Sequence, residues 1–258
     1  MEIDLSSETI LVTGGVGRIG MSVSTLLLEV GATVVISDIN EKKLADFEHQ
    51  MSVNFKNKIY AIPADITNKT NIVELIGKAF DVAGPITGAV HCAYPTSQGW
   101  GEAFDSLEEK FLKQDLGDQL GGVILFSQQI LDHFLQHSGG KLVHISSIQG
   151  VSAPKFHHYD DTQMNSPIEY SAIKTGVIAI TRWLAKKYSN KNIRVNCVSP
   201  GGVLDNQPEA FIQEYRRSCS NIGLLDSSQI SPSIIFLLSN YAEAINGQNI
   251  IVDDGWSL

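Results

Sequence analysis

Near its amino end the chain reads TILVTGGVGRIG over residues 9–20. Residues 9–13 form a short, largely apolar run, which is typical of a strand buried on both faces of a parallel sheet. Glycines follow at once, and a helical pattern begins at Arg18. At such a turn, glycines let the backbone approach a pyrophosphate, and the amino end of the helix stabilises its negative charge. The stretch therefore predicts a strand, a dinucleotide-binding turn and a helix.

Strands and helices continue to alternate along the 258 residues. Six further strands are predicted at 33–37, 58–63, 86–92, 141–146, 193–199 and 249–252. Helical patterns occupy 18–30, 41–50, 68–83, 107–137, 167–189 and 229–239, the fourth broken near Gly117 or at Gly121 and Gly122. No linker or repeat interrupts this order. We therefore expect residues 1–258 to form one Rossmann-like α/β domain, with a doubly wound, seven-stranded parallel sheet and helices on both faces.

Composition and charge narrow the class of protein. Nineteen Lys and Arg oppose 28 Asp and Glu, a formal net charge of −9, which argues against nucleic acid or an anionic membrane as partner. The three cysteines form no C-x-x-C pair, which favours a reducing compartment. No apolar run approaches the roughly 20 residues of a membrane span, and no basic segment at the amino end indicates a signal peptide. We expect a cytoplasmic protein with a small-molecule substrate.

An acidic residue, Asp38, ends the second predicted strand. A carboxylate there can accept hydrogen bonds from both ribose hydroxyls of NAD and would repel the 2′-phosphate of NADP. We therefore expect NAD, with NADP less favoured; the alternative is that Asp38 is a turn or capping residue. Arg18 could partly offset the repulsion of a 2′-phosphate. Asp65, after the third strand, either contacts the adenine or caps the next helix.

A candidate reacting centre combines Ser147, which follows the fifth strand, with Tyr170 and Lys174. Ser166, as a helix cap, and Glu169 three residues later predict that a helix begins just before Tyr170. Residues four apart lie on one helix face, so we expect the Lys174 ammonium to lower the pKa of Tyr170. Two hydroxyls aimed at one substrate oxygen would stabilise the charge formed as a hydride moves. An isolated pair of this kind is usually an ordinary surface contact, but its position after a glycine turn and a serine favours catalysis.

With these motifs, the chain resembles the short-chain dehydrogenase/reductase family over essentially its whole length. The resemblance rests on residues 13–20, Asp38, Asp65, Ser147, Tyr170-x-x-x-Lys174, 196–201 and 246–255. Residues 146–174 and 246–258 further resemble the branch called flagellin modification protein A, which is associated with bacterial sugar biosynthesis for surface glycans.

The resemblance implies a set of site residues. Ser147, Tyr170 and Lys174 would be catalytic, with Lys174 also holding the nicotinamide ribose. Gln119 would replace the asparagine that supports a proton relay. The implied cofactor contacts are Gly14, Gly17, Arg18, Ile19, Gly20, Asp38, Asp65, Ile66, Cys92, Ala93, Tyr170, Lys174, Pro200, Gly201 and Val203.

The chain also departs from the family pattern. Arg18 occupies the middle glycine of compact members, and His91-Cys92-Ala93-Tyr94 replaces N-N-A-G. The threonine that usually follows the Pro-Gly turn is replaced near Asp205.

Two polar segments, 149–165 and 201–223, are too long for tight connections, and we expect them to be substrate loops. The first lengthens the spacing from the serine to the tyrosine relative to compact members. Its cationic and hydroxyl-bearing side chains suit a polar, sugar-derived substrate. No metal is expected, because adjacent histidines point apart. The candidate substrate contacts are Ser147, Lys155, His157, His158 and Tyr159.

The expected function is an NAD(H)-dependent oxidoreductase that interconverts a hydroxyl and a ketone on a sugar phosphate or nucleotide sugar. One alternative is an epimerase or dehydratase, in which the hydride returns to the same substrate. Another is a non-catalytic NAD-binding subunit. Apolar residues surround much of the helix at 167–189, including Val177, Ile178, Trp183 and Leu184, and this excess suggests a partner helix. The family resemblance implies a homodimer or homotetramer through this helix. Burial within one chain is the alternative.

Overall fold

Strand β1 (Thr9–Thr13) lies inside the sheet, and all five of its residues are buried. The computed structural model describes residues 3–258. Seven strands form one sheet in the order β3-β2-β1-β4-β5-β6-β7, and every pairing is parallel. The doubly wound, seven-stranded sheet predicted from the apolar runs is therefore confirmed. The other strands are β2 (Thr33–Ser37), β3 (Ile59–Ala61), β4 (Gly88–His91), β5 (Gly140–Ile145), β6 (Ile193–Pro200) and β7 (Asn249–Val252).

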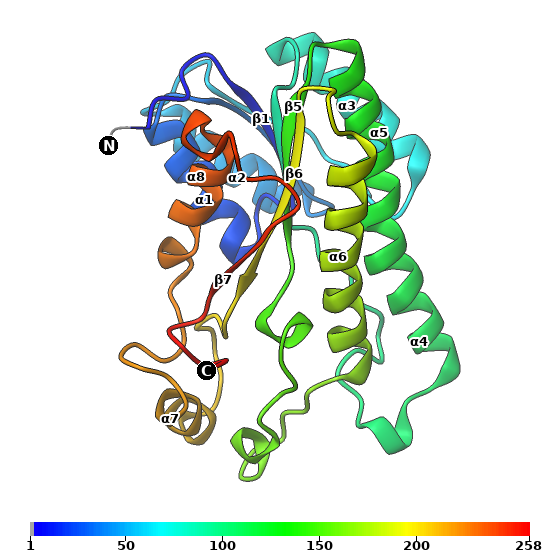
Figure 1. Cartoon of the computed structure of the whole chain (residues 1–258), viewed down its shortest axis with the longest axis vertical. Helices are drawn as coiled ribbons and strands as arrows, with labels where there is room; N and C mark the ends of the chain where they lie inside the picture. Colours follow the sequence, from blue (N-terminus) through cyan, green and yellow to red (C-terminus); the bar gives the residue numbers. More distant parts are fainter. Residues whose placement is uncertain (1–2) are drawn as a thin grey trace.

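Helices cover both faces of this sheet (Figure 1). On one face, α1 (Arg18–Glu29), α2 (Glu41–Ser52) and α8 (Ser231–Leu238) contribute to one apolar cluster. On the other, α3 (Lys69–Ala83), α5 (Gly122–Gln136) and α6 (Ile168–Lys187) contribute to a second. Because the strands are buried from both sides, their sequences are apolar throughout rather than alternating.

The long helix predicted over 107–137 contains a widened turn rather than a break. Helix α4 (Glu109–Asp115) runs into a π-helical turn (Leu116–Gly121), which continues directly into α5. The backbone dihedrals stay helical through Gly121 and Gly122. Glycine lowers helix propensity by about 1 kcal/mol. The helix continues here because the turn packs against α6 and α5 packs into the apolar cluster on the sheet.

Helix α7 (Glu209–Arg217) lies within the segment 201–223, which was expected to be a loop. Its buried residues are Phe211 and Tyr215, one turn apart, and both pack in a small apolar cluster with Trp256 near the carboxyl end of the chain. The helix was not predicted because it is only nine residues long, is mostly polar and has a short apolar stripe. The helix depends on packing partners that are distant in the sequence.

The predicted cap of α6 is also wrong. The helix is capped by Pro167, and Ser166 instead donates a hydrogen bond to Gln149 in the insert. Glu169 is buried, so it does not reach back to close a capping box.

The order of the strands reverses between β1 and β4, and the loops that follow the carboxyl ends of these two strands frame the crevice where open α/β sheets bind ligands.

Candidate active site

The glycine turn between β1 and α1 is built without room for side chains. Gly14 has a φ of 64°, and a Cβ there would lie 2.6 Å from the Ala93 nitrogen. A Cβ on Gly20 would lie 2.1 Å from the Gly14 oxygen. In the part of the chain described, the cap of α1, Gly17, offers no side-chain hydrogen bond, so the first amide groups of the helix stay available to an anion. The turn fits a pyrophosphate.

One end of the crevice suits an adenosine. A cavity of about 330 Å³ there is lined by Asp38, Asp65, Ile66 and Ala93. Asp38 accepts hydrogen bonds from the backbone nitrogens of Asn40 (3.0 Å) and Val16 (3.4 Å), which fix the carboxylate at the end of β2.

Of the two roles that the sequence left open for Asp65, the helix cap is not found. Asp65 lines the adenosine cavity and also accepts hydrogen bonds from the Thr67 backbone nitrogen and hydroxyl at 2.9 and 2.7 Å. The next helix, α3, is capped by Asn68 rather than by Asp65.

A second cavity, of about 410 Å³, continues from the first and shares Gly14, Gly17, Cys92 and Tyr94 with it. Between them, the two cavities are lined by every residue that the sequence proposed as a cofactor contact. The members of that set in the second cavity are Gly14, Gly17, Arg18, Ile19, Gly20, Cys92, Tyr170, Lys174, Pro200, Gly201 and Val203.

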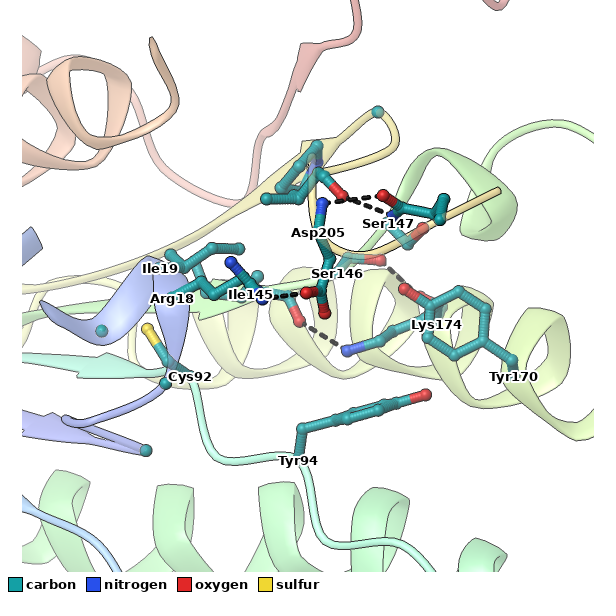
Figure 2. A pocket seen from close by; sticks show the side chains of 17 residues that line it. Arg18, Ile19, Cys92, Tyr94, Ile145, Ser146, Ser147, Tyr170, Lys174 and Asp205 are labelled. Atoms are coloured by element: carbon teal, nitrogen blue, oxygen red, sulfur yellow. Dashed lines mark hydrogen bonds and ion pairs between the residues drawn. The ribbon is translucent and has the colours of Figure 1, made fainter. Parts of the chain in front are cut away.

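Ser147, Tyr170 and Lys174 line the second cavity together (Figure 2). The Lys174 Nζ donates a hydrogen bond to the Ile145 carbonyl oxygen at 3.1 Å and lies 5.5 Å from the centre of the Tyr170 ring. The neighbouring Ser146 hydroxyl donates to the Lys174 carbonyl oxygen at 2.7 Å and so ties α6 to the end of β5. Helix α6, which carries Tyr170 and Lys174, is thus fastened to the end of β5, the strand that precedes Ser147.

The expected lowering of the Tyr170 pKa is wrong, because the net shift of this pKa is upward. Burial raises the pKa of Tyr170, and a hydrogen bond from the Ser147 hydroxyl lowers it less. Burial also lowers the pKa of Lys174 to about 8. Sequence spacing placed a cation beside the phenol but could not show that both groups lose solvent, and burial disfavours both charged forms. Tyr170 is therefore a neutral phenol that can donate a proton.

Gln119, proposed as a relay residue, lies in the π-helical turn and outside the lining of both cavities. It is buried, and within residues 3–258 neither of its amide atoms has a hydrogen-bond partner. The same holds for both carboxylate oxygens of Glu169, which precedes Tyr170.

The insert at 149–165 packs against α7 and the carboxyl end rather than lining the second cavity. Lys155 donates a hydrogen bond to the Trp256 carbonyl oxygen at 2.8 Å. His158 is buried and bonds through Nε2 to the Ser218 hydroxyl at 2.8 Å, while His157 is exposed. Tyr159 packs on α7. Lys155, His158 and Tyr159 therefore anchor the insert, whereas His157 is at the surface. The sequence hid this anchoring because α7 went unrecognised.

Several cavity residues were not proposed from the sequence. Tyr94 lines both cavities, and its ring lies 5.8 Å from that of Tyr170 and 5.4 Å from that of Trp100, in edge-to-face contacts. The Lys174 Nζ lies 5.0 Å from the centre of the Tyr94 ring. In the sequence, the replacement of the family's N-N-A-G by His91-Cys92-Ala93-Tyr94 was a signal that Tyr94 lies in the site. No sequence feature pointed to the contact of Trp100 with Tyr94 and Tyr170. Asp205 and Gln207 also line the second cavity.

His91 is a core residue. Its Nδ1 lies 2.8 Å from the Thr13 hydroxyl, and its ring stacks on Phe126. Burial, chiefly, keeps its pKa well below the usual range, so the ring is neutral. The histidine that replaces the family's residue at this position therefore joins β4 to β1, and its side chain lines neither cavity.

A crevice with a pyrophosphate turn in its middle and a proton donor at one end suits hydride exchange between a dinucleotide and a substrate. The site is that of a dinucleotide-dependent oxidoreductase. A family model described as enoyl-(acyl carrier protein) reductase matches residues 15–257. The chain belongs to the short-chain dehydrogenase/reductase family, whose members use NAD or NADP and act on hydroxyl and keto groups.

Similar proteins span nearly the whole chain. Post-translational flagellin modification protein A of Campylobacter coli is 38% identical over 255 residues, which cover 98% of this chain and 100% of that protein. The 7alpha-hydroxysteroid dehydrogenase of Bacteroides fragilis is 27% identical over 98% of this chain and 95% of its own. A short chain dehydrogenase from Leptospira borgpetersenii, solved with bound NAD+, has a TM-score of 0.86 and 29% identity, covering 100% of this chain and 94% of that one.

The described residues form neither a metal site nor a membrane-spanning helix. Among residues 3–258, no group of three or more His, Cys, Asp or Glu side chains is placed to hold a metal ion. The described helices include none with the length and apolar character needed to cross a membrane.

Proposed function

We propose that the protein is an NAD(H)-dependent oxidoreductase that interconverts a hydroxyl and a ketone on a sugar phosphate or nucleotide sugar, in the cytoplasm, during surface-glycan biosynthesis. The observation that carries this proposal is the convergence of Ser147, Tyr170 and Lys174 on the same cavity as the glycine turn. The flagellin modification relative and the resemblance of residues 146–174 to that branch support a sugar-derived substrate.

The chemistry divides between the cofactor and three side chains. When bound, the nicotinamide supplies or accepts the hydride at the substrate carbon. In reduction, the Tyr170 hydroxyl transfers its proton to the carbonyl oxygen, and the Ser147 hydroxyl donates a hydrogen bond to the same oxygen as negative charge builds there. Lys174 would hold the nicotinamide ribose. In oxidation the same transfer runs in reverse: Tyr170 must first lose its own proton, and the resulting phenolate then accepts the proton of the substrate hydroxyl.

Two features support NAD over NADP. The Asp38 carboxylate lines the adenosine cavity, where it would repel a 2′-phosphate. Arg18, expected to offset that repulsion, pairs with Asp205 instead and does not line the adenosine cavity. Among the residues described, no Lys, Arg or His side chain lines the adenosine cavity.

The aromatic wall beside Tyr170 supports a sugar-derived substrate. Tyr94 lines both cavities with its ring next to Tyr170, and Trp100 packs against both of these rings without lining either cavity. Amphipathic aromatic side chains offer both a flat apolar face and a polar edge. A polyhydroxylated ring can pack on such a face while its hydroxyls reach Ser147 and Tyr170.

We also propose assembly through α6. Of its apolar residues, Val177, Ile178 and Leu184 are buried within the chain, whereas Trp183 is 61% exposed. The surface available to a partner helix is therefore narrower than the sequence pattern indicated.

The direct test is an NADH-release screen with sugar phosphates and nucleotide sugars, with the Tyr170→Phe variant as control. Substrate-dependent NADH formation by the wild-type protein, lost in the variant, is the expected result. Product formed without net NADH would indicate the epimerase or dehydratase reaction instead. Undiminished activity of Tyr170→Phe would overturn the assignment of the proton donor.

A further inference from the structure

Arg18 is the first residue of α1, and its guanidinium forms an ion pair with the Asp205 carboxylate in the segment between β6 and α7 (Figure 2). The two residues are 187 positions apart in the sequence. Both line the cavity that contains Tyr170 and Lys174. The pair thus connects the glycine turn to the opposite side of the cavity.

Neighbouring residues in the same segment form hydrogen bonds that position Asp205. The Asp205 backbone nitrogen donates a hydrogen bond to the Gln207 Oε1 at 2.7 Å, and the Gln207 Nε2 donates to the Val203 carbonyl oxygen at 2.8 Å. The Asn206 amide donates to the Asp205 Oδ1 at 2.9 Å. These hydrogen bonds fix the position of Asp205 in the cavity lining, where its carboxylate pairs with Arg18.

The pair is weak enough to exchange. The two side chains are 52% and 45% exposed, and exposed ion pairs contribute little because water screens them. A cofactor pyrophosphate at the start of α1 would bring two negative charges close to the guanidinium, whose planar set of donors matches phosphate oxygens. The same charges would be repelled by Asp205 once Arg18 no longer neutralises it.

We propose that Arg18 is a pyrophosphate-binding residue that exchanges between two anionic partners, the Asp205 carboxylate and the cofactor pyrophosphate. Asp205 competes for the guanidinium and so limits the affinity of the site for the dinucleotide. The proposal rests on the proposed function only in taking the crevice as a dinucleotide site. It assigns Arg18 to the middle of the cofactor, not to the adenosine ribose near Asp38.

Binding of NADH and of ADP-ribose, measured by calorimetry without substrate, tests the proposal. Both probes carry the pyrophosphate and lack a 2′-phosphate. Arg18→Gln should weaken both by roughly ten-fold, the lower range for a hydrogen bond to a charged group. Asp205→Asn should tighten both by up to about five-fold, the range set by an exposed ion pair. Arg217→Gln, which removes a similarly exposed arginine paired with Glu214, is the matched control and should bind as the wild type does.

Thermal unfolding of each variant checks that the fold is retained. Binding of both probes within two-fold of wild type in Arg18→Gln would overturn the proposal, as would a loss confined to NADH, which would place Arg18 at the nicotinamide. Weaker binding in Asp205→Asn would refute competition by that carboxylate. A wild-type protein that binds neither NADH nor NADPH would overturn the proposed function itself, so the two failures are distinguishable.

Discussion

Replacing Lys174 with methionine should abolish catalysis and yet stabilise the folded protein at neutral pH. Lys174 is 8% exposed, and burial lowers its pKa from 10.5 to about 8. Below both values the ammonium is charged in the folded and unfolded states alike, and the shift costs about 3 kcal/mol of folding free energy. Methionine keeps most of the apolar stem but leaves the Ile145 carbonyl oxygen without its donor, a loss of about 1 kcal/mol. The net gain for Lys174→Met at pH 7 is about 2 kcal/mol.

The sign of the pH dependence follows from the same shift. As pH rises from about 8 to about 10.5, the folded state loses the proton while the unfolded state keeps it, so the penalty in the wild type shrinks. Between pH 7 and pH 9.5 the advantage of Lys174→Met should fall by about 2 kcal/mol. Urea unfolding of both proteins at the two pH values, at one protein concentration, measures this difference. A variant that is less stable at pH 7, or whose advantage does not change with pH, would refute the reasoning.

Three further changes probe the cofactor and substrate ends of the crevice and the assembly. Asp38→Asn should raise NADPH affinity by roughly ten-fold relative to NADH, because a like charge is removed; an unchanged ratio in fluorescence titrations contradicts the ribose assignment. Tyr94→Leu keeps an apolar side chain but removes the ring, so KM for an active sugar substrate should rise several-fold more than kcat falls; an effect on kcat alone contradicts a binding wall. Trp183→Glu should shift the protein toward monomer in gel filtration, and an unchanged elution volume argues against assembly through α6.

The strands were predictable because both faces of a parallel sheet are buried, so each strand appears as a continuous apolar run in the sequence. Helix α7 was missed because its stability depends on Phe211 and Tyr215 packing against Trp256, a contact between distant segments. The same gap hid the packing of His158, whose buried ring contacts Phe211 and Trp256 of this cluster. Local pattern gives an element's type, and tertiary packing decides whether a weak element forms.

The site divides in the same way. The proposed cofactor contacts follow the ends of β1, β2, β3, β4 and β6 or begin α1 and α6, so strand order alone was enough to bring them together. The ionisation of Tyr170 was not predictable, because it depends on loss of solvent rather than on the spacing to Lys174. Nor was the partner of Arg18 predictable, since Asp205 lies 187 positions away in the sequence.

The proton-donor role of Tyr170 is the central claim, and NADH formation by wild type and Tyr170→Phe tests it most directly. With the active compound from the sugar phosphate and nucleotide sugar screen, the variant should lose turnover by roughly 10²–10⁴-fold, the usual contribution of a positioned acid–base group. Calorimetry should show that it still binds NADH within about three-fold of wild type, since the phenol hydroxyl alone is removed. Turnover at the wild-type rate in Tyr170→Phe would contradict the account.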